Sequence, residues 1–148
     1  MLQMTMKEAL EKTDTSVDGL PWIYLYGEQE AGQPAIIFYV GQSAQPFERL
    51  QQHLGRGEDR RSSPFPDVIG EFILENQPVS LTWFVQVFGL AEMRAELKQE
   101  RLSINEAERV LIAHLKPCLN RVWNKYPTPL PLRYIRDLDI ANEGVLLE

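Results

Sequence analysis

The chain has 148 residues, of which 44% are hydrophobic and 24% are charged, so it is long enough for one domain with a real core. Its formal net charge of −6 excludes a protein that coats nucleic acid by bulk charge, although a small basic cleft stays compatible with an acidic body. The single cysteine, Cys118, excludes a disulfide scaffold and a cysteine-based zinc site, and its default interpretation is a buried thiol. Without a secretory signal after Met1 or an apolar run near ~18 residues, we expect one domain over residues 1–148, in the cytoplasm and not in a membrane.

The first part of the chain predicts a β-hairpin between two helices. Residues 4–12 are typical of a short amphipathic helix. Aromatic and β-branched runs at 22–26 and 35–40 predict two strands, and the polar turn between them favours antiparallel pairing. Residues 41–43 are expected to break the second strand, and apolar residues at helical spacing predict a helix from about Gln45.

The second part predicts one more strand and three more helices. Helical spacing favours a helix over 64–76, and a β-branched and aromatic run predicts a strand over 79–88. Two further helices are expected at 89–101 and 103–115, the second with Ser103 as its N-cap. The remaining residues are proline-rich and show little periodicity. The pattern therefore indicates an α/β or α+β domain, with a small sheet surrounded by helices.

Two groups on the helix that begins near Gln45 are suited to phosphate chemistry. Arg49 and His53 are four residues apart, so they share one helix face. The arginine is a permanent cation whose geometry matches a phosphate, and the histidine can exchange a proton near neutral pH. Taken alone, such a pair is more often a solvated helix face.

Glu108 interrupts an apolar stripe on the helix expected at 103–115, where Ile104, Leu111 and Leu115 would face the core. A buried carboxylate is costly unless it is paired or binds a metal ion. The alternative is a glutamate at the edge of the stripe, paired with a lysine or arginine.

Tyrosines are the third candidate group. Tyr24 and Tyr26 share one face of their predicted strand, and Tyr39 lies on the neighbouring strand. Such tyrosines are more often cross-strand packing residues than catalysts. Only the register of the hairpin decides which of the first two meets Tyr39.

Four segments, in order, resemble the motifs of the GIY-YIG nucleases. The first two are WIY at 22–24 and YVG at 39–41, and Arg49 follows ten residues after the tyrosine of the second motif. The fourth is ERVLIAHLKPCLN at 108–120, which resembles the glutamate helix of the family. The resemblance covers roughly residues 20 to 121. Two positions depart from the family pattern, because Trp22 replaces a glycine and Gln42 replaces a common basic residue.

The resemblance implies a small three-stranded antiparallel sheet flanked by helices and a metal-dependent DNA endonuclease. Glu108 would bind Mg²⁺ or another divalent metal, Arg49 would hold the phosphate, and Asn120 would steady the site by hydrogen bonds. The general base stays open between Tyr24, Tyr39 and His53, the last matching a subset of the family that includes some restriction endonucleases. The active-site positions implied by the resemblance are Tyr24, Tyr39, Arg49, His53, Glu108 and Asn120.

DNA contact requires positive charge, and two basic groups are candidates for phosphate contacts. A loop after the Arg49 helix holds Arg56, Arg60 and Arg61, and the C-terminal tail holds Arg121, Lys125, Arg133 and Arg136. The sequence does not reveal any DNA sequence specificity, which a homodimer or a partner subunit could supply. The alternatives are a non-catalytic DNA-binding or protein-interaction module that retains the fold, and a nuclease that acts as a toxin or within a larger repair or restriction assembly.

Overall fold

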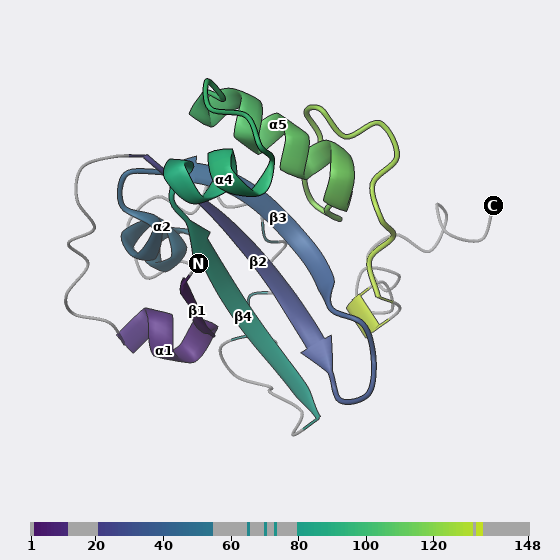
Figure 1. Ribbon diagram of the computed structural model, residues 1–148. Helices are drawn as coiled ribbons and strands as arrows, with labels where there is room; N and C mark the ends of the chain where they lie inside the picture. The colour runs from purple at the N-terminus through teal and green to yellow at the C-terminus, as the bar shows by residue number, and fades with distance from the viewer. Residues whose placement is uncertain are drawn as a thin grey trace.

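An antiparallel sheet with helices on both faces forms the centre of the protein in the computed structural model (Figure 1). The structure describes residues 2–11, 21–54, 65, 70, 73, 80–131 and 133–134. The elements are β1 (Leu2–Thr5), α1 (Met6–Glu11), β2 (Trp22–Glu30), β3 (Ile36–Ser43), α2 (Pro46–His53), β4 (Leu81–Phe88), α4 (Leu90–Glu96) and α5 (Ile104–Leu115).

The sheet has four strands in the order β1-β4-β2-β3, so the expectation of three strands is corrected. The added strand is β1, whose residues pair antiparallel with β4, from Leu2 opposite Val87 to Thr5 opposite Phe84. The helix predicted over 4–12 therefore begins only at Met6. Thr5 stops the strand and caps the helix, because its hydroxyl accepts from the Glu8 amide at 3.1 Å and donates to the Glu8 carboxylate at 3.0 Å.

The β2–β3 hairpin places Tyr26 opposite Tyr39 and Tyr24 opposite Gly41. A bulge between Tyr26 and Gly27 shifts the register beyond that pair. The prediction that residues 41–43 break the second strand is wrong, since β3 continues through Ser43. The cross-strand pairing with β2 continues through this stretch and keeps it extended.

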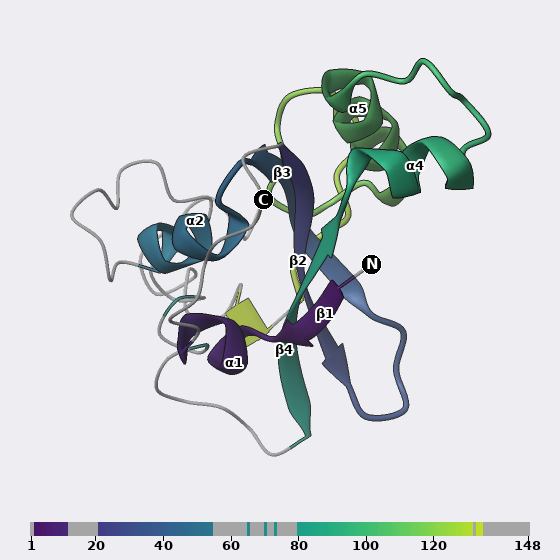
Figure 2. The ribbon, with the colours of Figure 1, turned by 60° about the vertical axis from the view of Figure 1, so that its left-hand side comes forward.

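Each face of the sheet has its own apolar core. The helices α1 and α2 cover one face (Figure 2). The core on this face has Tyr24, Tyr26, Phe38 and Val85 among its buried residues. The helices α4 and α5 lie over the other face, against a cluster that includes Ile23. Strand alternation sends neighbouring residues of β2 to opposite cores.

The helix predictions agree with most of the structure. The N-cap of α2 is Gln45, and α5 begins after Ser103, whose hydroxyl accepts from the Glu106 amide at 3.1 Å. The strand predicted over 79–88 is β4, while the helix predicted over 89–101 is shorter and ends at Glu96. The helix predicted over 64–76 lies almost wholly outside the described residues. In the part of the chain that the structure describes, no helix is long and apolar enough to span a bilayer.

After α5 the chain returns along the free edge of β3. The amide of Cys118 donates to the Ile37 carbonyl at 3.1 Å, and the amide of Leu119 donates to the Phe38 carbonyl at 2.8 Å. This segment covers an edge that would otherwise expose unpaired backbone groups. The Cys118 thiol is half-buried, and burial raises its pKa to about 11, so it is a packing residue at neutral pH.

A buried polar network joins Arg133 and Tyr134 to Glu28 on β2 and Trp83 on β4. The carboxylate of Glu28, which is 1% exposed, accepts from the guanidinium of Arg133 and from the hydroxyl of Tyr134. The indole of Trp83 donates to the Tyr134 hydroxyl at 3.1 Å. Burial next to the Glu28 carboxylate raises the pKa of Tyr134, which keeps the phenol protonated as a donor.

Candidate active site

Three tyrosines from the hairpin form the centre of the candidate site. The rings of Tyr24 and Tyr26 are 5.0 Å apart, and the ring of Tyr39 lies 6.2 Å from each of them. Register thus answers the question left open by the sequence, because Tyr39 pairs directly with Tyr26 and sits diagonally to Tyr24. Tyr24 is 3% exposed and Tyr26 is fully buried, whereas Tyr39 is half-buried and more accessible.

His53 lies beneath these rings and is not part of a solvated helix face. Its side chain is 4% exposed, and its Nδ1 lies 3.1 Å from the hydroxyl of Tyr26. Burial and the nearby positive charge of Arg49 lower the pKa of His53 to about 4, so the imidazole is neutral at neutral pH. A neutral ring bonded to Tyr26 is arranged to position that tyrosine.

Tyr26 is a site residue that the sequence interpretation did not select. It bridges His53 and the other two tyrosines, and its ring stacks 5.3 Å from that of Phe65. The sequence feature that could have identified Tyr26 is strand alternation, which places it on the same face as Tyr24. The histidine four residues after Arg49 then fits as its partner across the core.

Arg49 is half-buried on α2, beside a cavity of about 310 Å³ at the start of the helix. Ser43, Gln45, Glu48 and Gln52 also line this cavity. Five of the six residues that line the cavity are polar, and it lies where β3 ends and α2 begins. An anion that enters it would meet the guanidinium, whose planar donors match a phosphate or carboxylate.

Glu108 approaches from the other face of the sheet, because α5 packs opposite α2 (Figure 2). Its side chain is half-buried at the edge of the apolar stripe, while Ala107 and Ile112 are the buried residues of α5. Its hydrogen-bond partner is the neutral side chain of Gln42, not the lysine or arginine considered from the sequence. The amide of Gln42 donates to Glu108 Oε2 at 2.7 Å and to Asn105 Oδ1 at 2.6 Å. The residue that replaces a basic position of the family pattern therefore orients the carboxylate.

Both charges act on the same two phenols although their helices lie on opposite faces. Burial is the largest cause that raises the pKa of Tyr24 and of Tyr39. The carboxylate of Glu108 raises both pKa values further, and the guanidinium of Arg49 lowers both. The two charges therefore lie within electrostatic reach of the tyrosines, around the end of β3. Both phenols are therefore protonated at neutral pH.

Gly41 explains why the two short motifs belong together. A Cβ at this position would lie 2.6 Å from Tyr24 Cζ and would also collide with the hydroxyl of that ring. The phenol of the first motif thus lies directly over the glycine of the second, its cross-strand partner. The motif spacing places a buried phenol against the backbone of the strand end that leads to Arg49.

Asn120 uses its side-chain amide to imitate a neighbouring strand. Its Oδ1 accepts from the Val40 amide at 2.8 Å, and its Nδ2 donates to the Val40 carbonyl at 2.9 Å. Because Val40 lies between Tyr39 and Gly41, this bidentate contact fixes the strand that carries the candidate site. Asn120 is a positioning residue, since its amide is occupied by backbone groups and it is 7% exposed.

The predicted phosphate contacts differ in what the structure says of them. Arg56, Arg60, Arg61 and Arg136 lie outside the described residues. Arg133 is paired with Glu28 and lies 3.8 Å from Glu30, so its guanidinium already has two acidic neighbours, and its phosphate contact stays a prediction. Arg121 and Lys125 are exposed and stay candidates.

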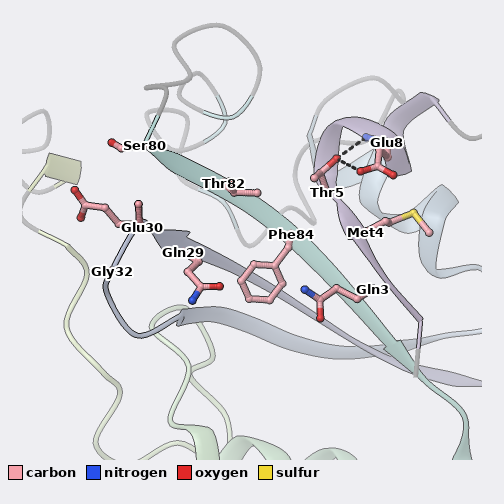
Figure 3. A pocket seen from close by; sticks show the side chains of 11 residues that line it. Gln3, Met4, Thr5, Glu8, Gln29, Glu30, Gly32, Ser80, Thr82 and Phe84 are labelled. Atoms are coloured by element: carbon pink, nitrogen blue, oxygen red, sulfur yellow. Dashed lines mark hydrogen bonds between the residues drawn. The ribbon is translucent and has the colours of Figure 1, made fainter.

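A second cavity, of about 470 Å³, lies on the sheet away from these residues (Figure 3). It extends over β4 between the β1–α1 junction and the β2–β3 turn, with Phe84 and Thr82 on its floor. Its walls carry Gln3, Gln29 and Glu30. None of its lining residues belongs to the predicted active-site set, so this hollow is separate from the candidate site.

The donor set at Glu108 suits a hard cation held mainly by water and substrate. Among the residues that the structure describes, no group of three or more His, Cys, Asp or Glu side chains lies together. Mg²⁺ is commonly bound through one or two carboxylates plus waters and phosphate oxygens, so a single oriented carboxylate fits that mode.

No protein-family model matches this chain, and no similar curated protein or solved structure was found.

Proposed function

We propose that this protein is a metal-dependent DNA endonuclease that hydrolyses phosphodiester bonds at the end of β3. The observation that carries the proposal is a tyrosine pair, Tyr24 and Tyr39 with rings 6.2 Å apart, that has Arg49 on one side and Glu108 on the other, each shifting the pKa of both phenols in the opposite direction. A permanent cation on one side of a tyrosine cluster, and on the other a carboxylate that would hold a divalent cation, suit an anionic substrate that gains negative charge in its transition state. The resemblance of the four sequence segments to GIY-YIG nucleases supports the same assignment.

The solvent accessibility of each site residue would determine its role in the reaction. Arg49 would bind a non-bridging oxygen of the phosphate from the polar cavity at the start of α2. Tyr39, the most accessible of the three phenols, would hydrogen bond to the attacking water and orient it. Tyr24 and His53 are 3% and 4% exposed, so they would support the site from below.

Glu108 would hold a divalent cation, with its carboxylate oriented by Gln42. When bound, such a cation polarises the phosphate and stabilises the leaving oxygen. A phenol whose pKa is raised does not serve as a base alone at neutral pH. Tyr39 would therefore orient the attacking water, and bulk solvent would accept the proton of that water once nearby positive charge lowers its pKa.

The decisive experiment is Mg²⁺-dependent nicking of supercoiled plasmid DNA by the purified chain. Glu108→Gln keeps the size of the side chain but removes its charge, and we expect cleavage to fall to background. Arg49→Ala should lose about 10²- to 10³-fold, the usual effect of removing a group that stabilises transition-state charge. Glu106→Gln, on the same helix but exposed, is the matched control and should cleave like the wild type.

Undiminished nicking by purified Glu108→Gln protein would place the activity elsewhere. The burial of Tyr24 and His53 favours one second candidate, a non-catalytic DNA-binding or protein-interaction module that keeps the tyrosine cluster as core. That candidate predicts DNA binding without nicking under any divalent metal. The same plasmid assay, together with a binding titration, separates the two.

A further inference from the structure

The segment after Asn120, together with α5, forms an exposed aromatic and cationic surface. Trp123 is 56% exposed and Tyr126 is 71% exposed, which is unusual for such large side chains. The guanidinium of Arg109 lies over the Trp123 ring, 4.0 Å from its centre, and the Lys125 ammonium lies 5.7 Å from the Tyr126 ring. We call this surface the Trp123 platform; it consists of Arg109, Arg121, Trp123, Lys125 and Tyr126.

The backbone holds Trp123 in a conformation that a bulky residue rarely adopts. Its φ angle is +63°, in the left-handed region, where side chains other than glycine, asparagine and aspartate are uncommon. This conformation costs free energy, and the exposed indole gains little from burial in return. Strain of this kind concentrates at functional positions, where the surrounding structure imposes it.

Two buried asparagines impose the conformation. The Nδ2 of Asn124 donates to the Pro117 carbonyl at 2.7 Å and to the Asn120 carbonyl at 2.9 Å. Asn120 is itself fixed to Val40 on β3. The turn that presents Trp123 is therefore rigidly attached to the strand that carries Tyr39, and its indole is pre-organised.

The platform is connected to α5 and β3, the elements that carry Glu108 and Gln42. The returning segment follows β3 toward its end, with Cys118 bonded to Ile37 and Asn120 bonded to Val40. The turn after Asn120 thus emerges near Gln42, which holds Glu108. Arg109, the cation over Trp123, is the next residue after Glu108 on α5.

Charge along the chain is distributed very unevenly around this surface. Residues 109–136 contain six basic residues and no acidic residue, whereas the rest of the chain contains nine basic and 21 acidic residues. Arg109, Arg121 and Lys125 are all exposed. An acidic protein thereby presents one cationic segment, and its aromatic rings are interleaved with the cations.

We propose that the Trp123 platform binds single-stranded nucleic acid, with an unpaired base stacked on Trp123 and adjacent phosphates on Arg121 and Lys125. Exposed aromatic rings flanked by cations are the arrangement that stacks bases and follows a nucleic-acid backbone without reading sequence. A base paired within a duplex has its faces covered by neighbouring bases, so the platform selects unpaired nucleotides. The inference deepens the proposed function and rests on it only for cleavage of the bound strand. Binding itself requires neither a metal ion nor Glu108.

The test is fluorescence anisotropy of a labelled thymidine oligonucleotide, in EDTA, compared with a duplex of the same length. We expect the wild type to bind the single strand more tightly than the duplex. Trp123→Ala should weaken single-strand binding roughly ten-fold or more, and Trp123→Phe, which keeps a stacking face, should lose much less. Leu2→Ala shortens another exposed neutral side chain, outside the platform, and is the charge-matched control that should bind like the wild type.

Trp123→Gly tests whether a loss of single-strand binding comes only from misfolding. Glycine tolerates a positive φ, so this variant should keep the melting temperature of the wild type or exceed it, yet bind as weakly as Trp123→Ala. Unchanged single-strand binding by either variant, absence of single-strand binding by the wild type, or preference for the duplex would each overturn the proposal. If Glu108→Gln loses plasmid nicking while Trp123→Gly binds the single strand like the wild type, the nuclease assignment stands and the platform proposal fails. If Glu108→Gln still nicks the plasmid while Trp123→Gly has lost single-strand binding, the platform proposal stands and the nuclease assignment fails.

Discussion

A single buried histidine connects the candidate site to the stability of the protein. The pKa of His53 is about 4 when folded and 6.5 in an unfolded chain, so between these values the unfolded chain binds a proton that the folded chain does not. The free energy of unfolding should therefore fall as the pH drops from 6.5 through 4, by roughly 3 kcal/mol in total at 1.36 kcal/mol per pKa unit. Urea unfolding across this range should show a shallower dependence in His53→Gln.

His114 provides the control for that titration, because it is exposed on α5. His114→Gln should keep the pH dependence of the wild type. A slope that is identical in the wild type and in His53→Gln would show that His53 is not buried in its neutral form.

Gly41 is the second position where one residue determines the arrangement of the site. Its φ is not in the left-handed region, so the cost of Gly41→Ala comes from the clash with the Tyr24 ring and not from the backbone. We expect a loss of about 1–3 kcal/mol, the usual range for overpacking, together with reduced cleavage as Tyr24 is displaced. Gly89→Ala, whose Cβ would meet Trp22 at 3.3 Å, should cost less in the same thermal unfolding assay. Equal losses in both variants would contradict the interlocked motifs.

At the scale of elements, local patterns predicted most helices and strands but not the way the edges are closed. The strand periodicity found β2, β3 and β4, and the Ser103 cap marked the start of α5. β1 was missed because Leu2–Thr5 is short and merges with an amphipathic pattern, although Thr5 and Glu8 carried a capping-box signal. Pairing partners are set by tertiary contacts, and a run of four residues contains little information on them.

The candidate site was predictable where it depends on spacing and unpredictable where it depends on burial. The spacing of Arg49 and His53 indicated a shared face, but only packing decides that the histidine lies under Tyr26. Likewise the interrupted stripe selected Glu108, but its neutral partner Gln42 comes from a strand 66 residues away. Contacts of such sequence separation leave no local pattern.

Asn120 offers an element-scale test, because it joins the returning segment to β3. Asn120→Asp keeps the shape of the side chain but replaces the donor to the Val40 carbonyl by an acceptor. The buried carbonyl then loses its partner and faces an oxygen, which should cost about 2 kcal/mol or more. Asn120→Ala leaves both backbone groups of Val40 without this partner and should also destabilise by roughly 2 kcal/mol. Urea unfolding with loss of less than ~0.5 kcal/mol in both variants would show that the segment does not hold the edge of β3.

At the scale of the whole molecule, the uneven charge distribution predicts where DNA contact is salt-sensitive. With a net charge of −6, the acidic body repels a nucleic-acid backbone, so attraction depends on local groups of basic residues, among them the acid-free segment at 109–136. Phosphate contacts release counterions, and a log–log plot of affinity against salt should lose roughly 0.7 units of slope for each contact removed from a single strand. Arg121→Ala combined with Lys125→Ala should thus lower the slope by about 1.4 units, while Lys7→Ala combined with Arg101→Ala, an equally exposed pair outside the segment, should leave it unchanged.

The same titration tests the loop arginines that the sequence predicted as DNA contacts. Arg60→Ala combined with Arg61→Ala should lower the slope by a similar amount and weaken binding about equally for all sequences, because phosphate contacts position DNA without reading it. Cleavage at saturating DNA should change little, since neither residue belongs to the predicted active-site set. An unchanged slope in that variant, beside a reduced slope in the Arg121 and Lys125 variant, would assign the nucleic-acid track to the C-terminal segment alone. The reverse result would move the track to the loop and leave the Trp123 platform without phosphates to bind.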